Sequence, residues 1–430
     1  MIYFDYQTKK VMHMKTFGFC TNNQLKQDAC EIIGAALHAA MPDVAVRNAL
    51  KRLPDTAGRL LLVAVGKAAW RMANTAYEVL GNRIDGGIVI TKHGHSEGAI
   101  GNLHIREAGH PVPDDATYAA TEEALSLTAD LCANDRVLFL LSGGGSALFE
   151  KPLLDEEETA SVTRQLLACG ADITEINTIR KRLSAVKGGK FALHVSPAKM
   201  FSVILSDVLG DAPDMIASGP AYPDRSSCAD AVLIAGKYSL VLSDHARALL
   251  QTETPKQLPD VETHIVGSAS ILCKAAKEVC ERLGYETTIL TDRLCCEARE
   301  AGSMLASIAQ TYAGKGKRAF VLGGETVVHL TGDGLGGRNQ ELAFSAAKGL
   351  DGLHALVFSV GSDGTDGPTD AAGGIADGET FAMLSKKEID HAAVLRRNDA
   401  FHALQAVDGL IFTGPTGTNV NDLTVLLIEE

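Results

Sequence analysis

The residues best suited to binding phosphate form the turn Ser142-Gly143-Gly144-Gly145-Ser146, which follows the hydrophobic run 136–141. Three consecutive glycines let the backbone approach a ligand closely, and their N–H groups can face an anion. A helix that follows such a turn adds its amino-terminal dipole. The alternative is a simple strand-to-helix turn, which does not need the entropic cost of three glycines. The chain has no G-x-x-x-x-G-K-S/T pattern, so we predict a phosphate-binding turn that is not a Walker A loop.

Two cations stand at the expected start of a helix. Lys67 follows an apolar run, and Arg338 follows the glycine loop 332–337. A helix dipole disfavours a cation at this end, and a bound phosphate or carboxylate would remove that cost. The alternative is a solvated side chain on the first turn. We predict that Lys67 and Arg338 act on an anionic substrate, Arg338 through bidentate hydrogen bonds, and that Gly336 and Gly337 bind phosphate.

The glycine loop also matches a dinucleotide-binding pattern. Gly332, Gly334 and Gly337 fit G-x-G-x-x-G, but a single match of this kind is weak. We expect the preceding residues, 318–330, to form a hairpin that turns at a pair of glycines. No acidic residue ends a strand about 20 residues further on, as the full pattern requires. The sequence therefore disfavours a nicotinamide site.

Acidic residues follow two other expected strands, with Asp207 and Asp211 after one and Asp363 and Asp366 after the other. Carboxylates at strand ends near a phosphate-binding turn can hold Mg²⁺ or act as a catalytic base. The alternative is turn capping by an aspartate beside glycine, which we weigh equally for Asp363 and Asp366. We predict Asp207 as a catalytic residue or metal ligand and Asp211 as a metal ligand. Glu325, at the expected hairpin turn, faces either the substrate or water.

The loop histidines are less suited to chemistry. His93 and His95 flank Gly94, and His110 precedes Pro111, but no third metal ligand lies nearby in the sequence. We therefore interpret them as polar loop residues. Ser146 does not fit the G-x-S-x-G pattern of a hydrolase nucleophile.

The composition excludes several classes of protein. The formal net charge of −13 disfavours binding to nucleic acid or an anionic membrane, and the single basic cluster, 180–190, is short. No apolar run is long enough to span a bilayer, and residues 1–20 lack the apolar core of a signal peptide. The nine cysteines are scattered and have no zinc-site spacing, which is typical of a cytoplasmic protein. We expect residues 1–20 to be a poorly ordered extension.

Strands and helices alternate along the chain, which predicts an α/β protein with mostly parallel sheets. A length of 430 residues favours two domains. The polar segment 251–260 contains two prolines and is the expected linker, so we predict a Rossmann-like domain over 21–255 and a second α/β domain over 256–430. Ligands bind outside the carboxyl ends of parallel strands, where the turn and the acidic residues are expected. The main expected strands are 60–65, 87–90, 136–141, 201–205, 263–267, 286–290, 355–360 and 423–428.

Several long motifs occur from about residue 22 to the end, among them VAVGKAAWRMA, LFLLSGGGSALF, SDVLGDAPDMIASGP, GGETVVHLTGDGLGGRNQELA and SVGSDGTDGPTDAAGG. With these motifs, in this order, the chain resembles the class II glycerate 2-kinases, the DUF4147 plus MOFRL family. The resemblance implies two different α/β domains around a deep cleft that holds the active site. It also implies transfer of the γ-phosphoryl group of ATP to the 2-hydroxyl of D-glycerate, with a divalent metal, usually Mg²⁺.

The resemblance also assigns residues. The family's catalytic lysine in V-G-K-A matches Lys67, and its arginine in G-G-R-N-Q-E matches Arg338. We hypothesise that the ATP phosphates lie near 142–146, that Asp207 or Asp211 helps to hold Mg²⁺, and that domain closure completes the site. The alternatives are an NAD(P)H-dependent hydroxypyruvate reductase and a non-catalytic sensor of sugar acids. We expect small-molecule ligands, no nucleic acid or membrane partner, and allow for a homodimer.

Overall fold

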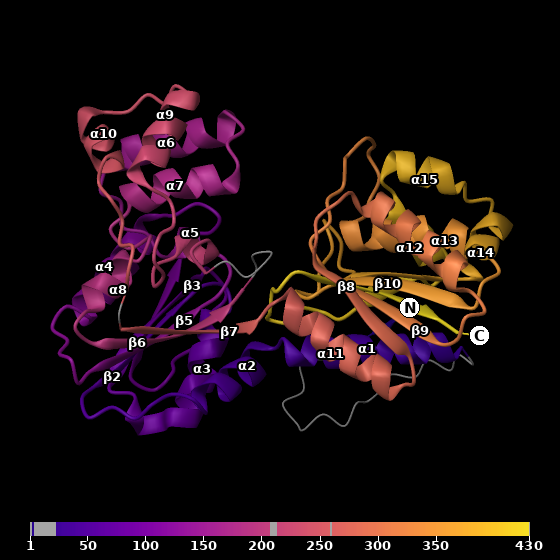
Figure 1. Cartoon of the computed structure of the whole chain (residues 1–430), viewed down its shortest axis with the longest axis horizontal. Helices are drawn as coiled ribbons and strands as arrows, with labels where there is room; N and C mark the ends of the chain where they lie inside the picture. The colour runs from indigo at the N-terminus through magenta and orange to yellow at the C-terminus, as the bar shows by residue number, and fades with distance from the viewer. Residues whose placement is uncertain (1, 4–22, 207–212, 259, 430) are drawn as a thin grey trace. The chain divides into compact units, whose positions relative to one another are not determined.

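The computed structural model describes residues 2–3, 23–206, 213–258 and 260–429. They form two compact units: unit 1 is Met1–Val44 with Gly267–Glu430, and unit 2 is Ala45–Val266. Each unit has one β-sheet flanked by helices (Figure 1). The prediction of two different α/β domains is therefore confirmed.

The sheet of unit 2 has six strands in the order β4-β3-β2-β5-β6-β7. The strand β2 pairs in parallel with β3 and β5, β3 with β4, and β5 with β6. Both β2 and β5 are buried at every position, because helices cover both faces of the sheet. The strands are β2 (Leu60–Val65), β3 (Gly86–Lys92), β4 (Leu103–Ala108), β5 (Arg136–Leu141), β6 (Lys199–Leu205) and β7 (Val261–Gly267).

Alternate residues of these strands contribute to two cores. One core packs against α2 (Pro42–Leu50) and α3 (Ala69–Leu80). The other packs against α4 (Asp115–Leu127), α5 (Gly145–Leu148) and α8 (Lys190–Val195). The period of two along each strand thus gives both faces an apolar surface.

Four more helices of unit 2 form a bundle with its own hydrophobic core, seen at the top of Figure 1. Leu166, Ile179, Ile234 and Leu250 are among its buried residues. The bundle is an insertion between strands of the sheet, with one pair of helices before β6 and one pair after it. Its helices are α6 (Glu156–Ala168), α7 (Ile173–Leu183), α9 (Cys228–Lys237) and α10 (Asp244–Leu250).

The sheet of unit 1 has the order β1-β12-β11-β10-β13-β9-β8 and is mostly antiparallel. The prediction of mostly parallel sheets is wrong here, because β13, the last strand of the chain, lies antiparallel between β10 and β9. Only the outer pairs β1–β12 and β8–β9 are parallel among the described strands. The strands are β1 (Ile2–Tyr3), β8 (Glu286–Leu294), β9 (Arg318–Gly324), β10 (Ala355–Gly361), β11 (Gly373–Asp377), β12 (Leu410–Phe412) and β13 (Asp422–Ile428).

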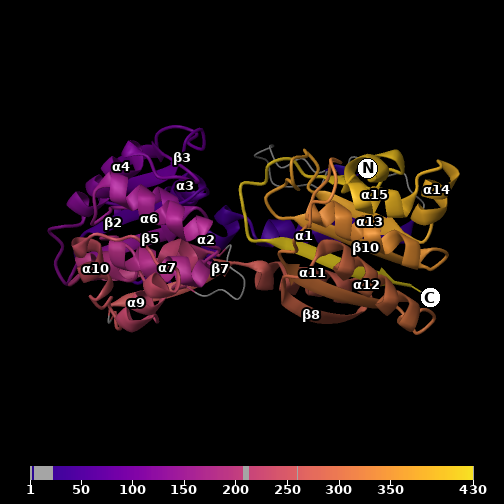
Figure 2. The ribbon, with the colours of Figure 1, turned by 90° about the horizontal axis from the view of Figure 1, so that it is seen from above.

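Helices cover both faces of this sheet as well. Helices α1 and α11 pack on one face, and α12 to α16 lie on the other, where α12 and α13 run side by side (Figure 2). Among the described residues, no single helix has the length and hydropathy to cross a membrane, whereas the bent pair α1 and α2 passes that test together. The helices are α1 (Gln24–Ala39), α11 (Ala269–Arg282), α12 (Ala298–Tyr312), α13 (Arg338–Leu350), α14 (Thr380–Lys386), α15 (His391–Arg397) and α16 (Ala400–Ala406).

The division into units differs from the predicted boundary between residues 255 and 256. The helix α1 buries its apolar face in the core of unit 1, and β7 belongs to the sheet of unit 2. The described residues of the polar segment, 251–258 and 260, therefore form part of a loop within unit 2. The hairpin predicted over 318–330 is also wrong, since only β9 forms there. Apart from β1, the extension predicted over residues 1–20 lies outside the described residues.

Candidate functional site

Three neighbouring strands of unit 2, β3, β2 and β5, end side by side, and β2 and β5 lead into the predicted phosphate-binding segments. Lys67 follows β2, and the turn 142–146 follows β5. The two segments are joined by hydrogen bonds: the Lys67 N–H donates to the Gly143 carbonyl at 2.9 Å, and the Ala68 N–H donates to Ser142 Oγ at 3.1 Å. The parallel sheet thus places Lys67 and the glycine turn together.

The glycines of the turn are required by close contacts. Gly144 has a φ of 86°, and a Cβ there would lie 3.0 Å from His110 Cδ2 and 3.2 Å from Lys67 Cγ. A Cβ on Gly145 would lie 2.6 Å from the Ala217 Cβ. The Ser146 hydroxyl is already 3.0 Å from the Ser218 hydroxyl. An alanine at position 144 would therefore adopt an unfavourable positive φ and would press on the His110 and Lys67 side chains.

Basic side chains gather around this turn. Burial lowers the pKa of His110, and the positive charges of Lys67, Lys92 and His95 lower it further. His95 Nδ1 also lies 3.3 Å from the Lys67 carbonyl oxygen. The helix α3 begins beside Lys67 with Ala68 as its N-cap, and its first turn has no acidic residue. The chain as a whole is acidic, but the positive charge around this turn favours an anionic ligand here.

The ammonium group of Lys67 is not paired with another side chain of the described residues. Among the residues described in the two units, its ammonium group has neither an ion pair nor a hydrogen-bond partner. Its main chain is fixed, however, because the Thr91 hydroxyl and His95 bond to its carbonyl. A fixed backbone with a free cationic side chain is the arrangement expected of a residue that binds a ligand.

Arg338 is placed differently. It is the first residue of α13 in unit 1, and its guanidinium forms a bidentate pair with Asp422 at 2.5 and 2.9 Å. Glu325 lies 3.3 Å from its Nη1. Burial alone would lower the pKa of Arg338, but the carboxylates of Asp422 and Glu325 raise it above its usual value. The protein itself thus supplies an anion for Arg338, so its position at the helix start does not by itself require a ligand.

The loop 332–337 is explained by packing. A Cβ on Gly332 or Gly334 would lie about 2.5 Å from the backbone of Arg397. The N–H groups of Gly332, Gly334 and Leu335 donate to Asn398 Oδ1, the Arg397 carbonyl and Asp399 Oδ1. The loop does not directly follow β9, so it lacks the strand-turn-helix context of a dinucleotide site. Gly336 and Gly337 as phosphate ligands remain a prediction.

The two aspartates after β10 cap backbone groups. Asp366 accepts hydrogen bonds from the N–H groups of Asn339 and Gln340 at the start of α13, at 3.1 and 2.9 Å. Asp363 accepts from the Thr365 N–H at 3.0 Å, which is an Asx-turn. The capping alternative therefore describes the geometry of both residues. Asp207 and Asp211 lie outside the described residues, and no group of three or more His, Cys, Asp or Glu side chains elsewhere in the described chain could hold a metal.

Comparison with known proteins shows to which family the chain belongs. The domain of unknown function DUF4147 matches residues 28–251, and the MOFRL family matches residues 318–422. The D-glycerate 2-kinase of Thermotoga maritima is 51% identical over 94% of this chain and 98% of its own. The chain belongs to the glycerate 2-kinase family. A crystal structure of glycerate kinase from the same organism matches with a TM-score of 0.91 over 94% of this chain and 99% of that one.

The glycerate 2-kinase family also contains relatives that carry another name. A putative hydroxypyruvate reductase of Agrobacterium vitis is 39% identical over 92% of this chain and 93% of its own. The two family matches lie in both units, and their ranges include Lys67 and Arg338. Membership therefore confirms the predicted resemblance, while the roles of single residues remain predictions.

Sequence reasoning missed two side chains beside Lys67. His95 and His110 were interpreted as ordinary loop residues, but both lie close to Lys67. The signal was their position: 93–95 follows β3, which is the parallel neighbour of β2. Asp422 was also missed as the partner of Arg338, because 84 residues separate them.

We expect Gly144→Ala to impair function more than stability. The alanine would adopt an unfavourable positive φ, at a cost of about 1–2 kcal/mol, and would press on Lys67 and His110. Gly170→Ala is the matched control, because Gly170 also has a positive φ of 74° but has open space around it. Both variants should lose similar stability in urea denaturation, and only Gly144→Ala should lose binding of nucleotide. Equal nucleotide affinities for the two variants would contradict a functional role of the turn.

Asp366 should make the stability of unit 1 depend on pH. Burial raises the pKa of Asp366 to about 6 despite its backbone hydrogen bonds, whereas an unfolded aspartate titrates near 3.9. The folded state therefore binds more protons between about pH 4 and pH 6, and the free energy of unfolding should fall as pH rises through this window. Relative to Asp366→Asn, we expect the wild type to lose up to about 3 kcal/mol, measured by urea denaturation. Parallel pH profiles of the two proteins would exclude this titration.

Proposed function

We propose that this chain transfers the γ-phosphoryl group of ATP to the 2-hydroxyl of D-glycerate, giving 2-phosphoglycerate. The observation that carries the proposal is the free Lys67 ammonium beside the glycine turn 142–146. Phosphoryl transfer depends mainly on positioning and on neutralisation of phosphate charge, which this cluster can provide. The 51% identity to a D-glycerate 2-kinase supports the same substrate.

We assign the residues as follows. The turn 142–146 and Lys67 bind the donor phosphates. Asp422 orients Arg338 and occupies two of its N–H donors. The remaining N–H donors of Arg338 bind the transferring phosphoryl group or the glycerate carboxylate. Glu325 helps to fix the same guanidinium. Mg²⁺ would enter with the nucleotide, and Asp207 and Asp211 remain its predicted ligands.

A turnover assay tests the proposal. ADP formation is coupled to NADH oxidation with D-glycerate, L-glycerate, tartrate and hydroxypyruvate as acceptors. We expect ADP formation that depends on D-glycerate and Mg²⁺. Binding of D-glycerate without ADP formation would instead indicate the non-catalytic sensor.

The names of some relatives favour hydroxypyruvate reduction as the second candidate. Against it, the only G-x-G-x-x-G match lacks a directly preceding strand. In the absence of coupling enzymes, NADH oxidation by hydroxypyruvate together with no ADP formation would establish the reductase.

We also propose a cytoplasmic location, because the eight described cysteines are free thiols.

A further inference from the structure

The helix α7 lies against the glycine turn of unit 2. The Ser218 hydroxyl donates to Asn177 Oδ1 at 2.8 Å and is 3.0 Å from the Ser146 hydroxyl. One turn further along α7, Arg180 Nη2 donates to the Ser146 carbonyl at 3.2 Å. The guanidinium of Arg180 is therefore held at the turn, which Lys67 also contacts.

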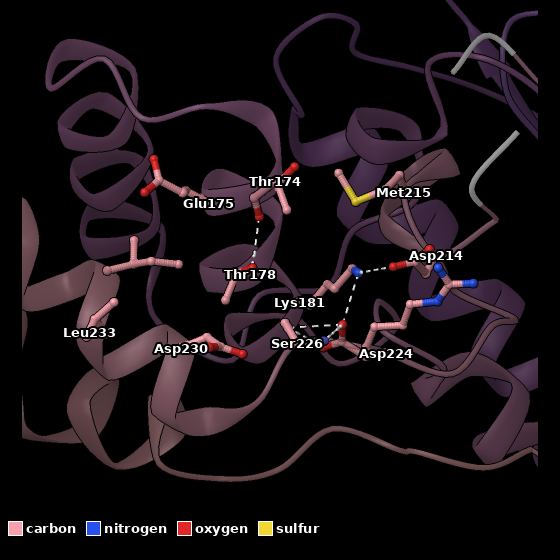
Figure 3. A pocket seen from close by; sticks show the side chains of 12 residues that line it. Thr174, Glu175, Thr178, Lys181, Asp214, Met215, Asp224, Ser226, Asp230 and Leu233 are labelled. Carbon is pink, nitrogen blue, oxygen red and sulfur yellow. Dashed lines mark hydrogen bonds and ion pairs between the residues drawn. The ribbon is translucent and has the colours of Figure 1, made fainter. Parts of the chain in front are cut away.

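Arg180 differs from the basic residues that follow it. Lys181 is buried, and its Nζ lies 3.0 Å from Asp224 and 3.6 Å from Asp214. Dashed lines mark both ion pairs in Figure 3. Arg182 is also buried and pairs with Asp224 and Glu253. These contacts neutralise both side chains inside the protein.

The same holds further along the cluster. The Lys187 ammonium is 2.7 Å from Glu150. Lys190 donates to three backbone carbonyls. Arg180 is the exception: within the described parts of unit 2 it has no carboxylate partner and donates only to the Ser146 carbonyl.

The positive charge of Arg180 affects the pKa of a neighbouring side chain, Lys187. Burial lowers the pKa of Lys187 to about 8; Glu150 opposes this shift and the Arg180 charge adds to it. The pocket in Figure 3, of about 490 Å³, does not suit an anion, because its lining has more acidic than basic side chains. The acidic residues are Glu175, Asp214, Asp224 and Asp230, and the basic residues are Lys181 and Arg225. On this part of α7, an anion would instead fit beside Arg180, at the side that faces the turn 142–146.

We propose that Arg180 is a phosphate-binding residue, which contacts the donor nucleotide at the turn 142–146 together with Lys67. A guanidinium has five N–H donors in a planar fork that suits two phosphate oxygens, and the protein occupies one of them. Lys67 and Arg180 both contact the turn, through Gly143 and Ser146 respectively. This inference rests on the proposed function, since it names a further ligand of the same donor phosphates.

Binding of tripolyphosphate and of ADP to the full chain, measured by calorimetry, tests this role without turnover. We expect Arg180→Gln to raise the Kd for tripolyphosphate roughly tenfold to a hundredfold, as for the loss of hydrogen bonds to a charged group. Arg180→Lys should bind with intermediate affinity, because it keeps the charge but loses the fork. Arg164→Gln, which removes an exposed arginine from α6, should bind like the wild type. In turnover, Arg180→Gln should raise KM for ATP and leave KM for D-glycerate unchanged.

An unchanged Kd in Arg180→Gln would overturn the proposal. So would a KM increase confined to D-glycerate, which would assign Arg180 to the substrate carboxylate. If Arg180→Gln and Arg180→Lys bind equally weakly and both melt well below the wild type, Arg180 is structural and the proposal fails. Because the calorimetric arm needs no acceptor, it can confirm Arg180 even in a protein that does not phosphorylate D-glycerate.

Discussion

In the Lys67→Ala variant, we expect kcat for phosphorylation of D-glycerate to fall about a hundredfold to a thousandfold, as for the loss of one group that stabilises transition-state charge. The melting temperature should change little, because the Lys67 ammonium has no partner within the described chain whose loss would leave a charge unpaired. Steady-state kinetics and a thermal melt on the same preparation measure both effects. Lys67→Arg should recover only part of the rate, since a guanidinium carries the charge on a different geometry.

The control for Lys67→Ala is Lys199→Ala. Lys199 is exposed at the amino end of β6, on the opposite edge of the same parallel sheet. The two variants remove the same charge from the same unit, so a general electrostatic effect would lower both rates equally. A Lys67→Ala enzyme with near-normal kcat would refute the assigned role of Lys67.

Arg338→Ala should lose both activity and stability. The variant leaves the Asp422 side chain, which is 6% exposed, without its bidentate partner. Removing one member of a buried pair costs about 3 kcal/mol or more, because the remaining charge is unpaired. We expect kcat to fall at least about a hundredfold, and we expect a lower urea midpoint, unlike the Lys67 variant. Kinetics and denaturation separate the two residues.

The double variant Arg338→Ala/Asp422→Asn distinguishes the two roles of Arg338. Neutralising Asp422 removes the unpaired charge, so most of the lost stability should return. Activity should stay low, because the cation that acts on the substrate is still missing. A double variant that regains both stability and activity would show that Arg338 only balances Asp422.

The parts of the fold that the sequence predicts best are those with strong local patterns. The runs 60–65 and 136–141 are continuously apolar because helices cover both faces of their sheet, and both are strands. Short strands such as β12, with three residues, carry too little pattern to be recognised. The antiparallel order of the unit 1 sheet depends on β13 pairing with strands 61 to 110 residues earlier in the chain, which no local pattern encodes.

In the candidate site, too, local patterns could be predicted from the sequence and long-range contacts could not. Lys67 and the glycine turn could be paired from the sequence, because each follows a strand that the parallel sheet brings to one edge. The partner of Arg338 could not, because Asp422 is the first residue of a strand placed by long-range pairing. Arg180 was one residue in a basic cluster, and only the contacts of its neighbours with Asp224 and Glu150 set it apart.

The most direct test of the proposed reaction is the identity of its product. The full chain is incubated with ATP, Mg²⁺ and D-glycerate, and phosphorus-31 and proton NMR locate the new phosphate ester. We predict an ester at the 2-hydroxyl, formed in equal amount to ADP. An ester at the 3-hydroxyl, or unchanged D-glycerate and ATP after prolonged incubation, would contradict the proposed function.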